Sequence, residues 1–482
     1  MSSGVIVNLP AEAIENISSC FSGMSEKGTK DIPLIMLLSR WQPLSSKRQM
    51  KYVKKLKPHE FSIWGDRQPL LGQLDVELTE RCDNDCLHCC VNLPENDAGA
   101  RNREMGTGFV KEVLAGAAGL GCLAVRFTGG EPLLREDFAE LYEFARRLGM
   151  QVILFTNGRR ITPELAGLLA RIPPGRAVEV SAYGMRPESY DRVVRRKRAF
   201  TEFRRGIGLL AEHRVPFIVK GALLPLLKDE MTEFEDWART VSGRNEPPGV
   251  SMCFELRHRR DDPAKNARIA GLRATPDEAV AWLARNPRYR EEMREFCGKF
   301  MRPPGDRLFN CGAGLGACVD AYGRAQMCLS LRAPETVVDL RAGGNETAGD
   351  GVKASLRRAL SEFFPRQREQ RATNPEYLRR CARCFLKGLC EQCPAKSWME
   401  HGTLDTPVEY LCAVAHAQAR FLGLIAAGEN AWEVENWRER IARFIAGGVQ
   451  RPRREDGAAA DGFDAARDAG CRQREGPAQG ET

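Results

Sequence analysis

The strongest constraint on the fold is a regular alternation of short apolar runs and helical stretches between residues 72 and 260. The runs are rich in β-branched residues, which favour strands. Helical stretches such as FVKEVLAGAAGL and DFAELYEFARRLG separate them. Parallel strands need long crossover connections, usually helices, so the pattern predicts an α/β fold with a mostly parallel sheet. The six expected strands are LDVEL (74–78), LAVRF (123–127), QVILF (151–155), AVEVS (177–181), PFIVKGALL (216–224) and VSMCFEL (250–256).

The rest of the 482-residue chain divides by composition. Residues 1–71 form an N-terminal extension of unclear role that includes the basic stretch SKRQMKYVKKLKP. Residues 261–305 are expected to be a helical linker, and residues 306–416 a loop-rich domain with many cysteines and glycines. Residues 417–448 fit one or two C-terminal helices. Residues 449–482 are polar and small, which predicts a disordered tail.

Composition and charge narrow the class of protein. The chain is 43% hydrophobic, enough for a sizeable core. It contains no run of eighteen apolar residues and no basic-then-apolar leader at its start, so we expect a cytoplasmic protein without a membrane partner. The net charge of +8 is modest, and no zinc-finger, basic-zipper or aromatic RNA-binding signature occurs. We therefore expect no nucleic-acid partner.

Cysteine is the outlier in the composition, with 17 residues. Without a secretion signal, so many thiols argue against a disulfide framework and for metal ligands or catalytic groups. Twelve of them fall into three groups, and the other five are scattered and read as small buried hydrophobes. The groups are Cys82, Cys86, Cys89 and Cys90; Cys311, Cys318 and Cys328; and Cys381, Cys384, Cys390, Cys393 and Cys412.

The first group directly follows the first expected strand, as Cys82-Asp-Asn-Asp-Cys86-Leu-His-Cys89. Three thiolates at this spacing can hold three irons of a [4Fe–4S] cube and leave the fourth iron open. Taken alone, the spacing also fits a zinc site or an unligated loop. Other candidate residues follow the next three strands, at the strand ends where α/β folds place their active sites. They are Gly129-Gly130-Glu131-Pro132, Asn157 and Ser181.

Together these motifs resemble the radical S-adenosylmethionine (SAM) superfamily, whose fold is a partial (β/α)6 TIM-like barrel. The resemblance implies that Cys82, Cys86 and Cys89 hold a [4Fe–4S] cluster whose open iron binds SAM, with Cys90 as a non-ligand. It implies cleavage of SAM to a 5′-deoxyadenosyl radical and an external one-electron reductant such as flavodoxin or ferredoxin. It also assigns SAM contacts to Gly129, Gly130, Glu131, Pro132, Asn157 and Ser181. Close approach of a ligand suits glycine, and a carboxylate suits the ammonium group of SAM.

The C-terminal cysteines read Cys311-x₆-Cys318-x₄-Gly323-x₄-Cys328, then Cys381-x₂-Cys384-x₅-Cys390-x₂-Cys393, then Cys412. This pattern resembles the SPASM extension of radical SAM enzymes, which binds two auxiliary [4Fe–4S] clusters. Two spacings differ: Cys393 comes one residue early, and Cys318 one residue late. A structural zinc ribbon is the alternative, because paired CxxC motifs also bind zinc. The resemblance assigns Cys311, Cys328 and Cys393, with Cys318 as a possible fourth ligand, to one cluster and Cys381, Cys384, Cys390 and Cys412 to the other.

Three functions fit these motifs. The first is a maturase that crosslinks or oxidises a ribosomally made peptide or protein, which SPASM members commonly do. The second is a dehydrogenase or epimerase of a small molecule such as a sugar or alcohol. The third is a non-catalytic iron–sulfur electron carrier, which would not need the Gly-Gly-Glu-Pro element. The resemblance favours the first.

Overall fold

The computed structural model describes residues 71–242, 248–257, 261–341 and 350–447. The expectations for the N-terminal extension and for the tail fall on residues 1–70 and 448–482, outside this described part.

The expected parallel sheet is present, and its six strands neighbour one another in sequence order. The last strand is shorter than its apolar run, because it lies at the sheet edge and its only neighbour, β7, ends before Leu224-Pro225. The α/β class and the partial barrel expected from the sequence are therefore confirmed. The strands are β1 (Gln73–Thr79), β4 (Ala124–Gly129), β5 (Gln151–Thr156), β6 (Val178–Ser181), β7 (Phe217–Ala222) and β8 (Gly249–Ser251).

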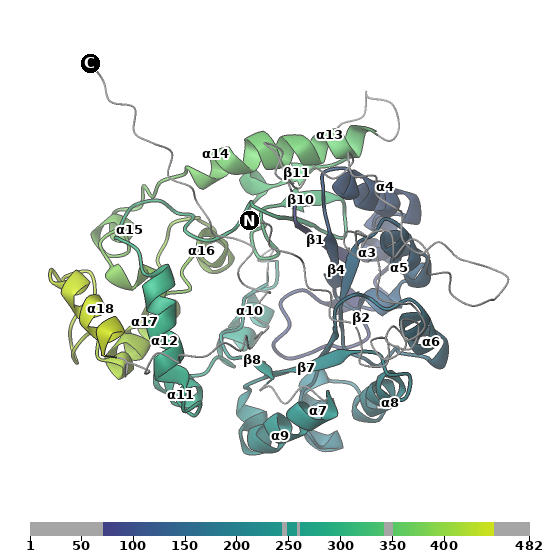
Figure 1. Ribbon diagram of the computed structural model, residues 1–482, viewed down its shortest axis with the longest axis horizontal. Coiled ribbons are helices and arrows are strands. Elements are labelled where there is room, and N and C mark those ends of the chain that lie inside the picture. The colour runs from purple at the N-terminus through teal and green to yellow at the C-terminus, as the bar shows by residue number, and fades with distance from the viewer. Residues whose placement is uncertain (1–70, 243–247, 258–260, 342–349, 448–482) are drawn as a thin grey trace, which may run out of the picture. The chain divides into compact units, whose positions relative to one another are not determined.

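Helices follow the strands along the outside of the sheet (Figure 1). In α5 the buried residues Phe138, Leu141, Tyr142 and Ala145 recur at helical spacing, so one stripe of the helix packs onto the core. These stripes and the strands share one hydrophobic cluster, which fixes where the strand ends meet. The helices are α3 (Ala98–Arg103), α4 (Thr107–Ala118), α5 (Phe138–Arg147), α6 (Pro163–Arg171), α7 (Pro187–Val194), α8 (Ala199–Glu212) and α9 (Met231–Val241).

The cysteine-rich segment is more regular than the sequence suggested. Its strand β9 pairs in parallel with β1, and β10 and β11 continue in antiparallel fashion, so the sheet has nine strands within the described residues. A helix from residue 350 to 368 packs along α4. Its buried Val352, Leu356, Leu360 and Phe364 do recur at helical spacing, but arginines between them obscure the period. The loop-rich expectation was wrong for this stretch.

The remaining elements are short or C-terminal. A second apolar cluster packs the last helices together. No helix among the described residues is both long and apolar enough to cross a membrane. The elements are β2 (Arg81–Cys82), β3 (Leu93–Pro94), α10 (Pro263–Ala270), α11 (Pro276–Leu283), α12 (Tyr289–Phe300), β9 (Ala317–Val319), β10 (Arg324–Gln326), β11 (Val338–Asp339), α13 (Asp350–Arg358), a π-helical turn Ala359–Phe363, α14 (Phe364–Arg368), α15 (Pro375–Arg379), α16 (Pro394–His401), α17 (Glu409–Leu422), α18 (Trp437–Ala446) and 3₁₀ turns at Pro132–Leu134, Pro225–Glu230, Pro334–Thr336 and Phe385–Gly388.

Candidate functional site

The first cysteine group lies on a loop directly after β1 and β2. Cys82 and Cys86 are buried and Cys89 is partly buried. Burial raises the pKa of the Cys82 and Cys86 thiols well above the ordinary value, and the charge of each neighbouring thiol raises it further. On their own, the Cys82 and Cys86 thiols therefore favour the neutral form. Bound iron would offset that cost, because metal ligation stabilises thiolates.

The backbone of this loop is held by α7 and by arginines. Asp85 N donates to Val194 O at 2.9 Å, and Leu87 N donates to Val193 O at 3.0 Å. Both acceptors are among the carbonyls that a helix leaves unpaired at its C-terminal end. The C-terminus of α7 therefore holds the loop on both sides of Cys86.

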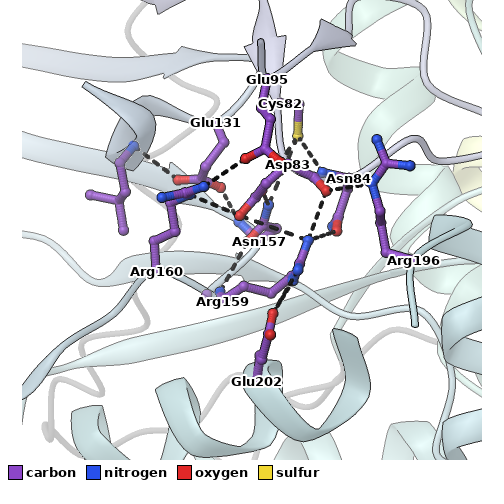
Figure 2. Close-up of polar contacts among 12 residues, drawn as sticks. Cys82, Asp83, Asn84, Glu95, Glu131, Asn157, Arg159, Arg160, Arg196 and Glu202 are labelled. Carbon is purple, nitrogen blue, oxygen red and sulfur yellow. Dashed lines mark hydrogen bonds and ion pairs between the residues drawn. The ribbon is translucent and has the colours of Figure 1, made fainter. Parts of the chain in front are cut away.

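Side chains surround Asp83 in the same loop, as Figure 2 shows. Its carbonyl accepts from Arg159 Nη1 at 2.8 Å and from Arg196 Nε at 2.9 Å. Its carboxylate accepts from Asn157 Nδ2 at 2.7 Å and from Arg160 Nε at 3.0 Å. Asn157 was predicted from its motif, but none of these three arginines was, since an arginine in a loop carries no distinctive spacing.

Gly129 and Gly130 are packed against the strand that leads to Cys82. Gly130 N donates to Thr79 O at 2.7 Å. A Cβ on Gly130 would come within 2.2 Å of Arg81 O, and one on Gly129 within 2.1 Å of Thr79 O. The sequence-based reason for these glycines was close approach of a ligand. In the structure, the close approach that requires them is to this backbone.

Glu131 is fully buried between the ends of β4 and β5. Its carboxylate accepts from Leu133 N at 3.0 Å, from Thr156 Oγ1 at 2.8 Å and from Asn157 N at 2.7 Å. Burial raises the pKa of this carboxyl to about 7. The bonds from Thr156 and Asn157 join the two strand ends, and the contact with a SAM ammonium stays a prediction.

The other expected SAM contacts lie at the same ends of the strands. Asn157 Nδ2 is 3.9 Å from Cys82 Sγ, so the β5 end meets the cysteine loop. Pro132 starts the 3₁₀ turn after β4, and Ser181 ends β6 and shares a hydrogen bond with Tyr183. The structure therefore brings together the ends of β1, β4, β5 and β6, as expected of a parallel α/β sheet.

His88, which directly precedes Cys89, adds an aromatic surface to the site. Its ring lies 4.9 Å from the ring of Tyr183 and 5.1 Å from that of Phe254, between centroids. Burial lowers the pKa of His88 to about 4, so the ring is neutral at pH 7. Its Nδ1 is buried and has no hydrogen-bond partner among the described residues. Tyr183 and Phe254 come from distant strand ends and could be found only from the fold.

Four of the C-terminal cysteines line a single pocket. Burial raises the pKa of the thiols of Cys381 and Cys384, to about 11 and about 12. His416 and Trp432 complete one wall, with ring centroids 5.4 Å apart. The pocket gathers the cysteines assigned from the sequence to one auxiliary cluster, namely Cys381, Cys384, Cys390 and Cys412.

Arg380 lies at this pocket and donates to Cys412 Sγ at 3.4 Å. It is held by Glu376 and by Glu409, at 3.1 Å and 2.7 Å. His416 accepts from Ala431 N through Nε2, so its proton is on Nδ1, which donates to Cys412 O at 2.8 Å. The pocket therefore offers a fixed donor to one sulfur.

The other cysteine set is only partly gathered. Burial raises the pKa of the Cys328 and Cys393 thiols, and the charge of the nearby Cys311 raises both further. Cys318 lies elsewhere, fully buried on β9 opposite Asp75 of β1. Burial raises the pKa of its thiol well above the ordinary value, and the charge of Glu77 raises it further while that of Arg332 lowers it. Its assignment as a ligand stays a prediction.

A buried ion pair joins the two cysteine-bearing regions. Arg332, which follows Cys328, pairs with Glu77 of β1, and both side chains are 3% exposed. Glu255, after β8, accepts from Ser330 Oγ at 2.9 Å.

Among described residues, no three His, Cys, Asp or Glu side chains surround one point as single-ion ligands do. A cluster of four irons spreads its thiolates more widely.

The fold is that of radical SAM enzymes. Residues 76–241 match the Radical SAM superfamily model, so this part of the chain is a radical SAM domain. The match covers the first cysteine group, Glu131, Asn157 and Ser181, but ends before the C-terminal cysteines.

Individual relatives cover only part of the chain. Fe-coproporphyrin III synthase of Methanosarcina barkeri is 31% identical over 166 residues, which is 34% of this chain and 40% of that protein. PqqA peptide cyclase of Streptomyces rochei is 40% identical over 96 residues, 20% of this chain and 26% of the relative. The chain thus spans less than half the length of these curated relatives.

Among solved structures, Streptococcus suis SuiB bound to its precursor peptide SuiA is similar, with a TM-score of 0.50 and 14% identity. That likeness covers 83% of this chain and 87% of SuiB. At this identity it shows the fold alone, but over a span that reaches well beyond residues 76–241.

Proposed function

We propose that this chain is a SPASM-type radical SAM enzyme that holds three [4Fe–4S] clusters and modifies a ribosomally made peptide or protein. The observation that supports it most is the convergence of the Cys82–Cys89 loop with the ends of β4, β5 and β6, together with the separate pocket lined by four thiols. When bound and reduced, SAM and its cluster supply a 5′-deoxyadenosyl radical that takes a hydrogen atom from the substrate.

The residues of the chain have distinct tasks in this proposal. Cys82, Cys86 and Cys89 would ligate the first cluster, on a loop that α7 holds on both sides of Cys86. Glu131 and Asn157 keep the ends of β4 and β5 against that loop. Cys381, Cys384, Cys390 and Cys412 would hold one auxiliary cluster, and Cys311, Cys328 and Cys393 the other.

We assign His88 a task of its own: its ring, which is neutral at pH 7, would help to exclude water near the first cluster. With Tyr183 and Phe254 it forms an apolar wall on which a planar group such as a purine can stack. A reactive carbon radical needs such a dry site, because water and side reactions compete with the substrate.

The choice of a peptide substrate rests on relatives. A peptide appears in the name of PqqA peptide cyclase and in the description of SuiB bound to its precursor peptide SuiA. The fold likeness to SuiB extends over most of this chain. Fe-coproporphyrin III synthase favours the alternative, a small-molecule substrate, and its match is the longer in sequence. The alternative is thus a dehydrogenase or epimerase of a small molecule.

The test is anaerobic reconstitution with iron and sulfide, followed by assay with dithionite and SAM. We expect 5′-deoxyadenosine, and none from the Cys82→Ala, Cys86→Ala, Cys89→Ala triple variant. Cys122, a buried thiol outside all three groups, provides the matched control Cys122→Ala. For the substrate, short peptides encoded beside this chain are added and examined by mass spectrometry. Loss of hydrogen from a peptide supports the maturase, whereas turnover of a small molecule alone supports the alternative.

A further inference from the structure

A strongly basic segment runs from the end of α7 into the start of α8. Its exposed residues are all cationic apart from one threonine, and its single acid, Glu202, is bound to Arg159. The side chains of Arg192, Lys197 and Arg198 make no ion pair with an acid among the described residues. The exposed cations are Arg192, Arg195, Lys197, Arg198, Arg204 and Arg205. Arg195 pairs with Asp85, and the like charges of the other five cations produce a positive field at the surface.

This segment touches the loop that carries the first cysteine group. Arg195 Nε donates to Asp85 O at 2.9 Å, and Arg196 Nε donates to Asp83 O at 2.9 Å. Asp85 directly precedes Cys86, and the Arg195 side chain is 37% exposed. At Arg195, the surface is therefore separated from Cys86 by one side chain and the backbone of Asp85.

We propose that residues 192–205, called here the basic segment, are the docking surface for a small acidic one-electron carrier protein that reduces the first cluster. The need for a reductant rests on the proposed function. One electron passes from the reduced carrier to the cluster, the carrier is oxidised by one electron, and no bond forms or breaks. Because electron transfer weakens steeply with distance, the carrier must dock close to the cluster, and opposite charges speed its encounter.

The position of the contacts favours a carrier over an acidic substrate. The basic segment contacts the backbone of the loop at Asp83 and Asp85. A substrate must instead reach the ends of the strands, beside His88 and Tyr183. Redox encounters of this kind bury small interfaces and depend on charge more than on apolar contact.

The test uses the full-length protein and flavodoxin as the probe. The charge-reversal variant is Arg192→Glu, Lys197→Glu, Arg198→Glu, which leaves Arg195 and Arg196 to hold the loop. The matched control, Lys299→Glu, Arg420→Glu, Arg443→Glu, makes the same charge change at exposed positions of α12, α17 and α18. The control lies in the C-terminal part, so it also reports on entry of electrons through the auxiliary clusters.

We expect the dissociation constant for oxidised flavodoxin to rise by about tenfold or more at low salt in the charge-reversal variant, with the difference shrinking as salt is added. Formation of 5′-deoxyadenosine should slow with reduced flavodoxin but not with dithionite. The control should match wild type. Binding of flavodoxin as tight as wild type by the charge-reversal variant, or an equal loss in the control, would overturn the docking proposal. Wild-type protein that fails to cleave SAM with dithionite would instead count against the proposed function.

Discussion

Glu131 gives the sharpest test of how the site is organised. The structure shows a buried carboxylate that accepts three hydrogen bonds, from Leu133 N, Thr156 Oγ1 and Asn157 N. The substitution Glu131→Gln keeps the size of the side chain but replaces one oxygen by an NH₂ group. Oε1 has two donors and Oε2 one, so the amide oxygen will replace Oε1 and the NH₂ will face Asn157 N–H. One hydrogen bond to a carboxylate is lost.

At about pH 8.5, where a carboxyl with a pKa of about 7 is ionised, loss of a hydrogen bond to this charged group costs about 1.5–3 kcal/mol. For a cooperative unit of the size of the radical SAM domain, this lowers the melting temperature by about 3–12 °C, at 2–4 °C for each kcal/mol. The assay is thermal unfolding of the protein before iron and SAM are added. Glu143→Gln is the matched control, because Glu143 lies on α5 of the same domain and has only an exposed pair with Arg147. We expect the control to stay within about 0.5 kcal/mol of wild type.

The same variants separate two roles of Glu131. If the carboxylate positions the strand ends, Glu131→Gln melts earlier without SAM and also binds SAM more weakly. If it only contacts the ammonium of SAM, affinity falls while the melting temperature without SAM is unchanged. Melting indistinguishable from Glu143→Gln would refute the positioning role derived from the three hydrogen bonds.

Three further predictions concern a glycine, an arginine that contacts a sulfur, and a pair of proposed cluster ligands. Gly130→Ala should unfold the radical SAM domain or abolish cluster binding, because its Cβ would lie 2.2 Å from a backbone oxygen, whereas Gly108→Ala, with open space around it, should melt like wild type or slightly later. Arg380→Gln should lower the reduction potential of the cluster in the four-thiol pocket, because a sulfur loses a charged donor; spectroscopic potentiometry with no downward shift would contradict this. Cys384→Ala with Cys390→Ala, if protease resistance shows it folded, should still produce 5′-deoxyadenosine but no modified substrate, and product at the wild-type rate would exclude an electron-accepting role.

The strands were predictable because each is a short apolar run, and because the six strands lie in the sheet in the same order as along the chain. Each β-branched run became a parallel strand, and each candidate residue after β1, β4, β5 and β6 lies at a strand end. The helix after residue 350 was missed because charged residues break up its visible apolar stripe, even though Val352, Leu356 and Phe364 are buried.

The site residues that the sequence did not predict were missed because their partners lie far away in the chain. Arg159 and Arg196 act through the backbone oxygen of Asp83, and any loop arginine looks alike in sequence. Arg332 and Glu77 are 255 positions apart, and only the pairing of β9 with β1 brings their regions together. The motif indicated that Glu131 matters, but two of its three hydrogen-bond partners, Thr156 and Asn157, come from the end of β5 and could not be read from its own neighbours.

The most direct test of the central claim is the iron and sulfide content of anaerobically reconstituted protein. Three clusters of four irons predict about twelve irons per chain with matching sulfide. The Cys82→Ala, Cys86→Ala, Cys89→Ala variant should keep about eight irons and lose SAM cleavage. Protein with about four irons together with bound zinc would contradict the auxiliary clusters. A variant of these three cysteines that still holds about twelve irons would contradict the assignment of the first cluster.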